Sequence, residues 1–306
     1  MKKAKMKKAK LIKGGNNMSA KLLGSVLAVT LTAAAAPAAR QDMLVTTDWL
    51  SKHLTDANVV VLHVSANRNA YDAGHIPGAR FVGLPELVVT RNGVPNELPE
   101  VPALKKVFEA AGISDNSRVI LYGDTSVLPA TRAYFTLDYL GHGDRAALLD
   151  GGLEKWRSEG RTLTKDAPAV AQGNLTPRLK PEIVVPMDAV KDITAKRGQP
   201  GTPVLLDVRP AADYSGEKGA HIPTAQNLNW MESQVSREDQ TLKSQDSLRT
   251  LYEAAGLKGD RPIVTYCNSG MQASQSYFTL KYLGYDVKMY DGSMSEWNAQ
   301  GAPVEK

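Results

Sequence analysis

The sequence contains only one cysteine, Cys267, among its 306 residues. A lone cysteine cannot close an intramolecular disulfide, so the chain must build its core without cross-links. It also leaves no cluster of cysteine and histidine on which a metal site could rest, and we expect no metal. Such a residue is either a small buried hydrophobe or a thiol kept free for chemistry.

Extremes of composition are missing too. Hydrophobic residues make up 42% of the chain and charged residues 23%. These values do not suggest a disordered, collagen-like or multi-span membrane protein. A length of 306 residues is natural for two domains.

Positive charge is concentrated at the N-terminus. Residues 1–38 hold eight lysines and no acid, so removing them changes the formal charge from +5 to −3. A mildly acidic protein gives no reason to expect nucleic acid as a partner.

The same segment is organised like a secretory signal peptide. Its lysines precede a short apolar run, LLGSVLAVTLTAAAA, and a small-residue ending, APA. The run is too short and too rich in alanine for a membrane span, and the absence of a twin arginine favours the general export route. We expect residues 1–38 to be removed and the mature protein to be periplasmic or secreted, without stable membrane association. An uncleaved N-terminal anchor is the alternative.

Four blocks of the sequence occur twice in the same order, 141 to 146 residues apart. They are YDAGHIPGARF and EKGAHIPTAQNL, VFEAAGI and LYEAAGL, YFTLDYLG and YFTLKYLG, and DGGLEKW and DGSMSEW. The repetition predicts a duplicated domain of about 130 residues. We place the two copies at residues 43–160 and 183–304. Residues 161–182, rich in proline, threonine and alanine, are expected to be the linker.

Each copy alternates strand and helix patterns. In the second copy, PVLLDV and PIVTY are short apolar runs that suit buried parallel strands. SLRTLYEAAG and ASQSYFTLKYLG have apolar residues at helical spacing and end in glycine. The fold class is therefore predicted to be α/β, with a parallel sheet flanked by helices on both faces in each domain.

Cys267 comes directly after the apolar run IVTY, and a helix pattern begins near Ala273. Ligands of open α/β folds bind at such strand-to-helix loops. Loop N–H groups and the helix N-terminus favour a thiolate there, so we expect the pKa of Cys267 to fall toward or below neutrality. Gly270 allows the unusual backbone angles of a tight cradle. The predicted cradle consists of Asn268, Ser269, Gly270, Met271 and Gln272.

The first copy lacks this thiol. Its corresponding loop, LYGDTSVLPATRAYF, has Gly123 and Asp124 at the site. One live site and one degenerate site explain the difference more simply than a structural cysteine does. We therefore interpret Cys267 as reactive.

Missing partners narrow the chemistry of the thiol. Cysteine phosphatases and arsenate reductases need an arginine six residues after the cysteine, where this chain has Ala273. Cysteine proteases need a histidine base, and none of the five histidines lies near Cys267 in sequence. His75 and His221 stand in matching HIP blocks and are interpreted as structural. A single thiolate among N–H donors suits sulfur transfer, in which it attacks a sulfane sulfur and becomes a persulfide.

Residues 43–304 resemble the tandem-domain rhodaneses, the thiosulfate/3-mercaptopyruvate sulfurtransferase family. The motifs that carry the resemblance are HIPGA (75–79), HIPTA (221–225), LLDVR (205–209), YCNSGMQAS (266–274), DGG (150–152) with Trp156, and DGS (291–293) with Trp297. The resemblance implies an inactive N-terminal domain, a catalytic C-terminal domain with Cys267, and a substrate pocket between them. It implies no cofactor other than the covalent persulfide.

The donor stays open between two branches of this family. The thiosulfate branch typically has arginine and lysine after the cysteine, whereas Asn268 and Ser269 are neutral here. The mercaptopyruvate branch has a serine that Ser269 matches, but its aspartate partner is replaced by Gly83. The leading hypothesis is a thiosulfate sulfurtransferase with cyanide or a thiol as acceptor. The alternatives are a 3-mercaptopyruvate sulfurtransferase and a persulfide carrier with little turnover; the protein acceptor is unknown.

Two further residues are candidates for substrate binding. Arg178 lies near where the family places an anion-binding arginine, although it is also an ordinary solvated linker charge. Trp230 lines the pocket or is a plain core aromatic. Arg209, two residues after Asp207, is expected to form a structural ion pair.

Overall fold

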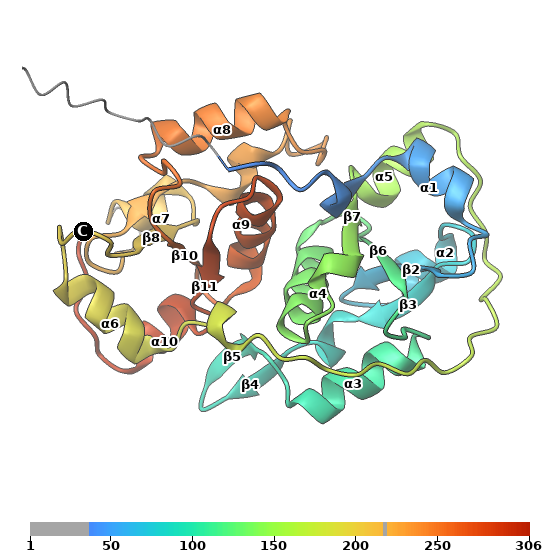
Figure 1. The fold of residues 1–306 in the computed structure, drawn as a ribbon, viewed down its shortest axis with the longest axis horizontal. Helices are drawn as coiled ribbons and strands as arrows, with labels where there is room; N and C mark the ends of the chain where they lie inside the picture. Colours follow the sequence, from blue (N-terminus) through green and yellow to red (C-terminus); the bar gives the residue numbers. More distant parts are fainter. Residues whose placement is uncertain (1–36, 217–218) are drawn as a thin grey trace, which may run out of the picture. The chain divides into compact units, whose positions relative to one another are not determined.

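Two parallel β-sheets form the centres of the two halves of the chain (Figure 1). The first sheet, in the order β1-β7-β6-β2-β3, comprises β1 (Leu44–Val45), β2 (Val59–Ser65), β3 (Arg80–Gly83), β6 (Arg118–Tyr122) and β7 (Ala146–Leu149). The second, in the order β11-β10-β8-β9, comprises β8 (Val204–Asp207), β9 (Gln226–Asn227), β10 (Ile263–Tyr266) and β11 (Val287–Met289). Neighbouring strands in both sheets run parallel. This confirms the predicted α/β class.

The computed structural model describes residues 37–216 and 219–306. These residues belong to one compact unit, residues 36–306. Apart from its last two residues, the predicted signal peptide at 1–38 lies outside the described part of the chain. Within the described ranges, no helix has the length and apolar character needed to cross a membrane.

Helices cover both faces of each sheet. In the first domain they are α1 (Thr47–His53), α2 (Asn69–Ala73), α3 (Val101–Ala110), α4 (Leu128–Tyr139) and α5 (Gly152–Ser158). In the second they are α6 (Met187–Ala195), α7 (Ala211–Tyr214), α8 (Gln245–Ala254), α9 (Met271–Tyr282) and α10 (Ser293–Ala299). Alternate residues of β2 serve opposite faces, because Val60 and Leu62 join one core while Val61 joins the other.

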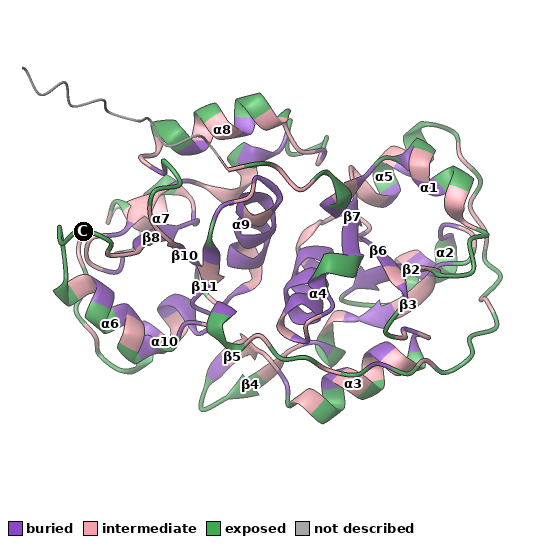
Figure 2. Ribbon diagram, in the orientation of Figure 1, coloured by how far each residue is buried: buried purple, intermediate pink, exposed green. Residues whose placement is uncertain are grey.

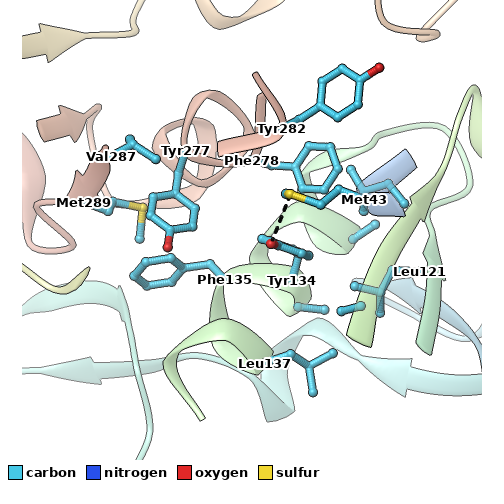
Figure 3. Close-up of a cluster of buried hydrophobic side chains, with 14 of the residues drawn as sticks. Met43, Leu121, Tyr134, Phe135, Leu137, Tyr277, Phe278, Tyr282, Val287 and Met289 are labelled. Atoms are coloured by element: carbon cyan, nitrogen blue, oxygen red, sulfur yellow. Dashed lines mark hydrogen bonds between the residues drawn. The ribbon is translucent and has the colours of Figure 1, made fainter. Parts of the chain in front are cut away.

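The inner faces of the two sheets share one continuous hydrophobic core. Helices α4 and α9 cross its middle and are buried almost all round (Figure 2). Tyr134 packs edge-to-face on Phe278 at 4.8 Å between ring centroids, and Phe135 packs on Tyr277 at 5.0 Å (Figure 3). The YF pair of one copy therefore contacts the YF pair of the other, which makes the duplicated domains parts of a single core.

Each domain also extends a segment toward the other. In the first domain this is an antiparallel hairpin, β4 (Val89–Arg91) and β5 (Val94–Glu97). In the second it is residues 234–242, closed by a bridge between Gln234 and Leu242. These corresponding segments bring side chains to the strand-to-helix loop of the opposite domain.

Candidate active site

Cys267 follows the carboxyl end of β10, which lies between β8 and β11. The apolar sequence of β10, IVTY, suits a strand buried on both faces. Helix α9 begins at Met271, and its N-cap, Gly270, has a φ of 80°. The thiol therefore belongs to a short loop that leads into the N-terminus of a helix.

Backbone N–H groups face the sulfur of Cys267. Burial raises the pKa of the thiol, because the side chain is only 2% exposed. The backbone N–H groups of Ala273, Ser269, Gln272 and Gly270 favour the thiolate and act in the opposite direction. Burial is the stronger effect, so the pKa lies above its ordinary value. The expected fall toward or below neutrality is thus wrong: donors can be counted from a sequence, but desolvation cannot.

Ser293 fixes the loop to the end of β11. Its hydroxyl accepts hydrogen bonds from the backbone N–H of Cys267 at 3.1 Å and of Gly270 at 3.2 Å, and donates to the carbonyl of Tyr290. Ser293 has a φ of 52°, in the left-handed region that residues with side chains rarely adopt. In the first domain the corresponding residue is Gly152, with a φ of 56° and no hydroxyl.

A buried ion pair formed by both domains lies behind the loop. Arg132 of α4 is fully buried and binds both carboxylate oxygens of Asp291, at 2.5 and 2.9 Å. The same guanidinium donates to the carbonyl of Asn96 at 2.6 Å, and the Asn96 side-chain amide donates to the hydroxyl of Ser269 at 2.9 Å. A Cβ atom on Gly270 would lie 2.4 Å from the Asp291 carboxylate, so this position requires glycine.

A second arginine borders the loop from the side of β8. Arg209 binds Asp207 through several hydrogen bonds of 2.6 to 3.1 Å, which confirms the expected ion pair. One of its nitrogens lies 3.5 Å from the side-chain oxygen of Asn268. The arginines at the loop are therefore balanced by carboxylates, and the loop presents backbone dipoles toward the sulfur.

The predicted cradle residues differ in their exposure. Asn268 is exposed and Ser269 is half-buried; the carbonyl of Asn268 accepts a hydrogen bond from the backbone of Ser295 at 2.9 Å. Met271 and Gln272 form the first turn of α9 and are half-buried. The loop residues thus surround Cys267, while their catalytic roles stay a prediction.

The two candidate substrate residues lie in different places. Arg178 is exposed in the linker, where its backbone N–H donates to Leu140, and it lines a cavity of about 390 Å³ with His142 and other first-domain residues. No hydrogen bond or ion pair in the described part of the chain joins Arg178 to the Cys267 loop. Trp230 begins the short 3-10 helix η5 (Trp230–Ser233) and packs against the shared core that contains Cys267. Substrate binding by either residue stays a prediction.

The corresponding loop of the first domain borders a cavity of about 460 Å³. Gly123 and Asp124 line it, and Gln240 of the second domain lies at its edge. The Gln240 side chain accepts from the backbone N–H of Val127 at 2.9 Å and donates to the carbonyl of Thr125 at 2.7 Å. This cavity adjoins the loop without a thiol, so the candidate for the chemistry remains the buried Cys267.

The matching histidines hold loops in place. His75 is buried, stacks on Tyr71 and contacts its carbonyl at 2.8 Å. His221 stacks in the same way on Tyr214 and contacts its carbonyl at 2.8 Å. Across residues 37–216 and 219–306, no group of three or more histidine, cysteine, aspartate or glutamate side chains could hold a metal ion.

Sequence reasoning assigned no role at the loop to four residues: Asn96, Arg132, and Asp291 and Ser293 of the DGS motif. A signal was present in the differences between the two copies. Where the second copy has Ser293 the first has a glycine, and where the first has Arg132 the second has Gln275. Nothing in the sequence showed that these positions are buried at one site.

Comparison with known proteins identifies the two halves. Residues 46–159 and 189–300 each match the Rhodanese-like domain. The chain belongs to the rhodanese-like family. It is a rhodanese-family sulfurtransferase with two such domains in tandem, which confirms the resemblance seen in the motifs.

Relatives of this rhodanese-like protein differ in name. The chain is 37% identical over 288 residues to the "Sulfur carrier protein TtuD" of Thermus thermophilus, covering 88% of this chain and 98% of the relative. It is 34% identical over 283 residues to a "Putative thiosulfate sulfurtransferase" of Saccharopolyspora erythraea, covering 87% and 97%. A solved structure of EanB with a cysteine persulfide and ergothioneine has a TM-score of 0.76 and 25% identity, covering 87% of this chain and 70% of EanB.

Proposed function

We propose that the protein moves a sulfane sulfur from thiosulfate to a thiophilic acceptor, such as cyanide or a thiol, through a persulfide on Cys267. One observation carries the proposal: the only cysteine in the chain lies between the end of β10 and the N-terminus of α9, where four backbone N–H groups favour its thiolate. These fixed donors favour negative charge on the sulfur and offset part of the cost of its burial.

The chemistry needs no cofactor. The Cys267 thiolate attacks the outer sulfur of thiosulfate, a sulfur–sulfur bond forms, and sulfite leaves with the bonding pair of the old bond. The outer sulfur of the resulting persulfide carries the charge. An acceptor such as cyanide then attacks that sulfur, takes it as thiocyanate and returns the thiolate. The raised pKa of Cys267 means that the free thiolate is scarce at neutral pH and the first step is favoured by alkaline conditions.

Of the two donors, the structure gives less support to 3-mercaptopyruvate. Ser269 matches that branch, but its hydroxyl is bound by the amide of Asn96, which is not an acid. Gly83 donates its backbone N–H to Glu86 and offers no side chain for a relay. Thiosulfate therefore remains the leading donor, and the ratio of kcat/KM for the two donors tests the choice.

A persulfide carrier is the second candidate. It is favoured by the low exposure of Cys267, 2%, which would protect a bound sulfur from small acceptors. The similarity to the "Sulfur carrier protein TtuD" supports the same candidate. A carrier would keep its adduct and release little thiocyanate when thiosulfate and cyanide are supplied repeatedly.

Intact-mass measurement after thiosulfate exposure tests the proposal. We expect the purified protein to gain the mass of one sulfur atom and to lose it on addition of cyanide. Cys267→Ser should show neither adduct nor thiocyanate production, because no other cysteine exists in the chain. Sustained activity of that variant would rule out the mechanism. An adduct that resists cyanide would favour the carrier.

We also propose that this chemistry takes place after export. The basic, then apolar, N-terminal sequence supports removal of residues 1–38. Cell fractionation with mass measurement of the recovered protein tests this, and a full-length cytoplasmic product would contradict it.

A further inference from the structure

The first domain contributes to the Cys267 loop although it has no thiol of its own. Its hairpin carries Asn96 to Ser269, and its helix α4 carries Arg132 to Asp291. We call Asn96, Arg132 and Asp291 the interdomain network. The contacts join residues far apart in sequence, 173 positions for Asn96 and Ser269 and 159 for Arg132 and Asp291.

The interdomain network continues into the backbone around the sulfur. The Ser269 N–H is one of the groups that face Cys267, and the Ser269 hydroxyl is bound by Asn96. At the other end, Asp291 is followed two residues later by Ser293, whose hydroxyl holds the N–H groups of Cys267 and Gly270. The loop is therefore held from both sides, by the first domain at Ser269 and by Ser293 at its base.

The charge of Arg132 is costly where it lies. It is fully buried, one of its nitrogens, Nε, has no hydrogen-bond partner, and its carboxylate partner Asp291 is also buried. Removing such a pair from water carries a desolvation cost that the attraction between the two charges has to offset. The corresponding position of the second copy is the neutral Gln275. The fold therefore tolerates an uncharged residue at this point, and the charge is placed only on the side of the thiol.

The degenerate site provides an internal comparison. The backbone N–H of Leu98 binds Asp291 at 3.2 Å, and that of Leu242 binds Asp150 at 3.0 Å. The β4–β5 hairpin and residues 234–242 therefore dock on the opposite domain in the same way. Gln240, in the place of Asn96, bonds only the backbone of the opposite loop. A side-chain contact to a hydroxyl of the opposite loop, from Asn96 to Ser269, occurs at the loop that contains Cys267.

We propose that Asn96 and Arg132 are positioning residues for sulfur transfer, which hold Ser269 so that its backbone N–H faces the Cys267 sulfur. The inference rests on the proposed function, because positioning matters for turnover only if Cys267 reacts. The domain without a thiol is then a working part of the active site.

Asn96→Gly tests the role of the amide. Asn96 has a φ of 62°, which glycine adopts without strain, so the variant removes the side chain while keeping the hairpin. We expect kcat/KM for thiosulfate to fall about threefold to tenfold, the size of one lost hydrogen bond. The pH at which iodoacetamide alkylates Cys267 at half its maximal rate should rise. Gln240→Ala, the matched change at the degenerate site, should alter neither value by more than about twofold.

A double-variant cycle with Ser269→Ala separates positioning from general loosening. If Asn96 acts through Ser269, the double variant should be no more impaired than either single variant. Independent, multiplying losses would overturn the proposal. So would a lower half-reaction pH in Asn96→Gly, which would mean that the hairpin shields the thiol. Alkylation needs no sulfur donor, so this arm still reports if thiosulfate proves not to be the substrate.

Discussion

Ser293 occupies a backbone conformation that glycine would adopt more cheaply. Its φ of 52° costs on the order of 1 kcal/mol for a residue with a Cβ atom. The first domain avoids this cost with Gly152. The serine is retained where its hydroxyl gathers the N–H groups of Cys267 and Gly270. Local stability is thus given up for the geometry of the thiol loop.

Comparing Ser293→Gly with Ser293→Ala separates strain from hydrogen bonding. Both variants lose the hydroxyl, so we expect each to lower kcat/KM by about tenfold or more, since two buried N–H groups lose their acceptor. Only alanine keeps the strain, so Ser293→Ala should be less stable than Ser293→Gly by about 1 kcal/mol. Urea unfolding and a thiocyanate assay measure the two effects. Equal stability of the variants would show that the backbone is not strained.

Helices α4 and α9 hold a buried carboxylate between the domains. Asp138 of α4 accepts hydrogen bonds from the Tyr277 hydroxyl at 2.7 Å and from Lys180 at 3.0 Å, and it pairs with Lys281 of α9. Burial alone would raise the pKa of Asp138, but the Lys281 ammonium and the other donors outweigh it and hold the pKa below its usual range. The ionised form therefore stabilises the packed helices.

Asp138→Asn should weaken this helix pair. We expect the free energy of unfolding at neutral pH to fall by about 1 to 3 kcal/mol, because a buried ion pair loses one partner while both lysines can still reach water. A lowered folded-state pKa gives stability that is present above the unfolded value and is lost as pH falls below about 3.8. The variant should lack that loss. Urea titrations across this pH range check it, and an unchanged acid limb would contradict the assignment.

Burial on these helices also limited prediction from sequence. The repeated blocks predicted two α/β domains, because each block keeps its strand or helix pattern in both copies. The apolar run IVTY likewise predicted the strand before Cys267. Arg132, however, reads as an ordinary solvated helix charge, and only tertiary packing turns it toward Asp291. The direction of the Cys267 pKa was missed for the same reason, since burial depends on contacts that local sequence does not contain.

The two halves of the molecule contribute differently to its stability in acid. His63 on β2 is fully buried, and neither ring nitrogen has a hydrogen-bond partner. Burial lowers its pKa to about 4 from 6.5. In the second sheet the corresponding strand position is Asp207, which is paired with Arg209. Only the first half therefore keeps an uncharged histidine at this place in its core.

His63→Phe should flatten the loss of stability in mild acid. The unfolded chain binds a proton near pH 6.5 while the folded chain resists it to about pH 4, so stability declines as pH falls through that window. The decline attributable to His63 is on the order of 3 kcal/mol. Phenylalanine keeps the ring packing against Tyr71 and Tyr122. Denaturant titrations between pH 7 and 4, roughly the span of the two protonation limits, check the slope. A slope equal to that of the wild type would refute the role of His63.

Helices α4 and α9 pack against each other and bury each other's side chains. This packing restricts how a sulfur donor can reach Cys267. Rotating the halves apart would put the rings of Tyr134, Phe135, Tyr277 and Phe278 into water, at about 25 cal/mol for every Å² of apolar surface exposed. Entry by a hinge is therefore expensive. We therefore expect a donor to reach Cys267 without separation of the two halves.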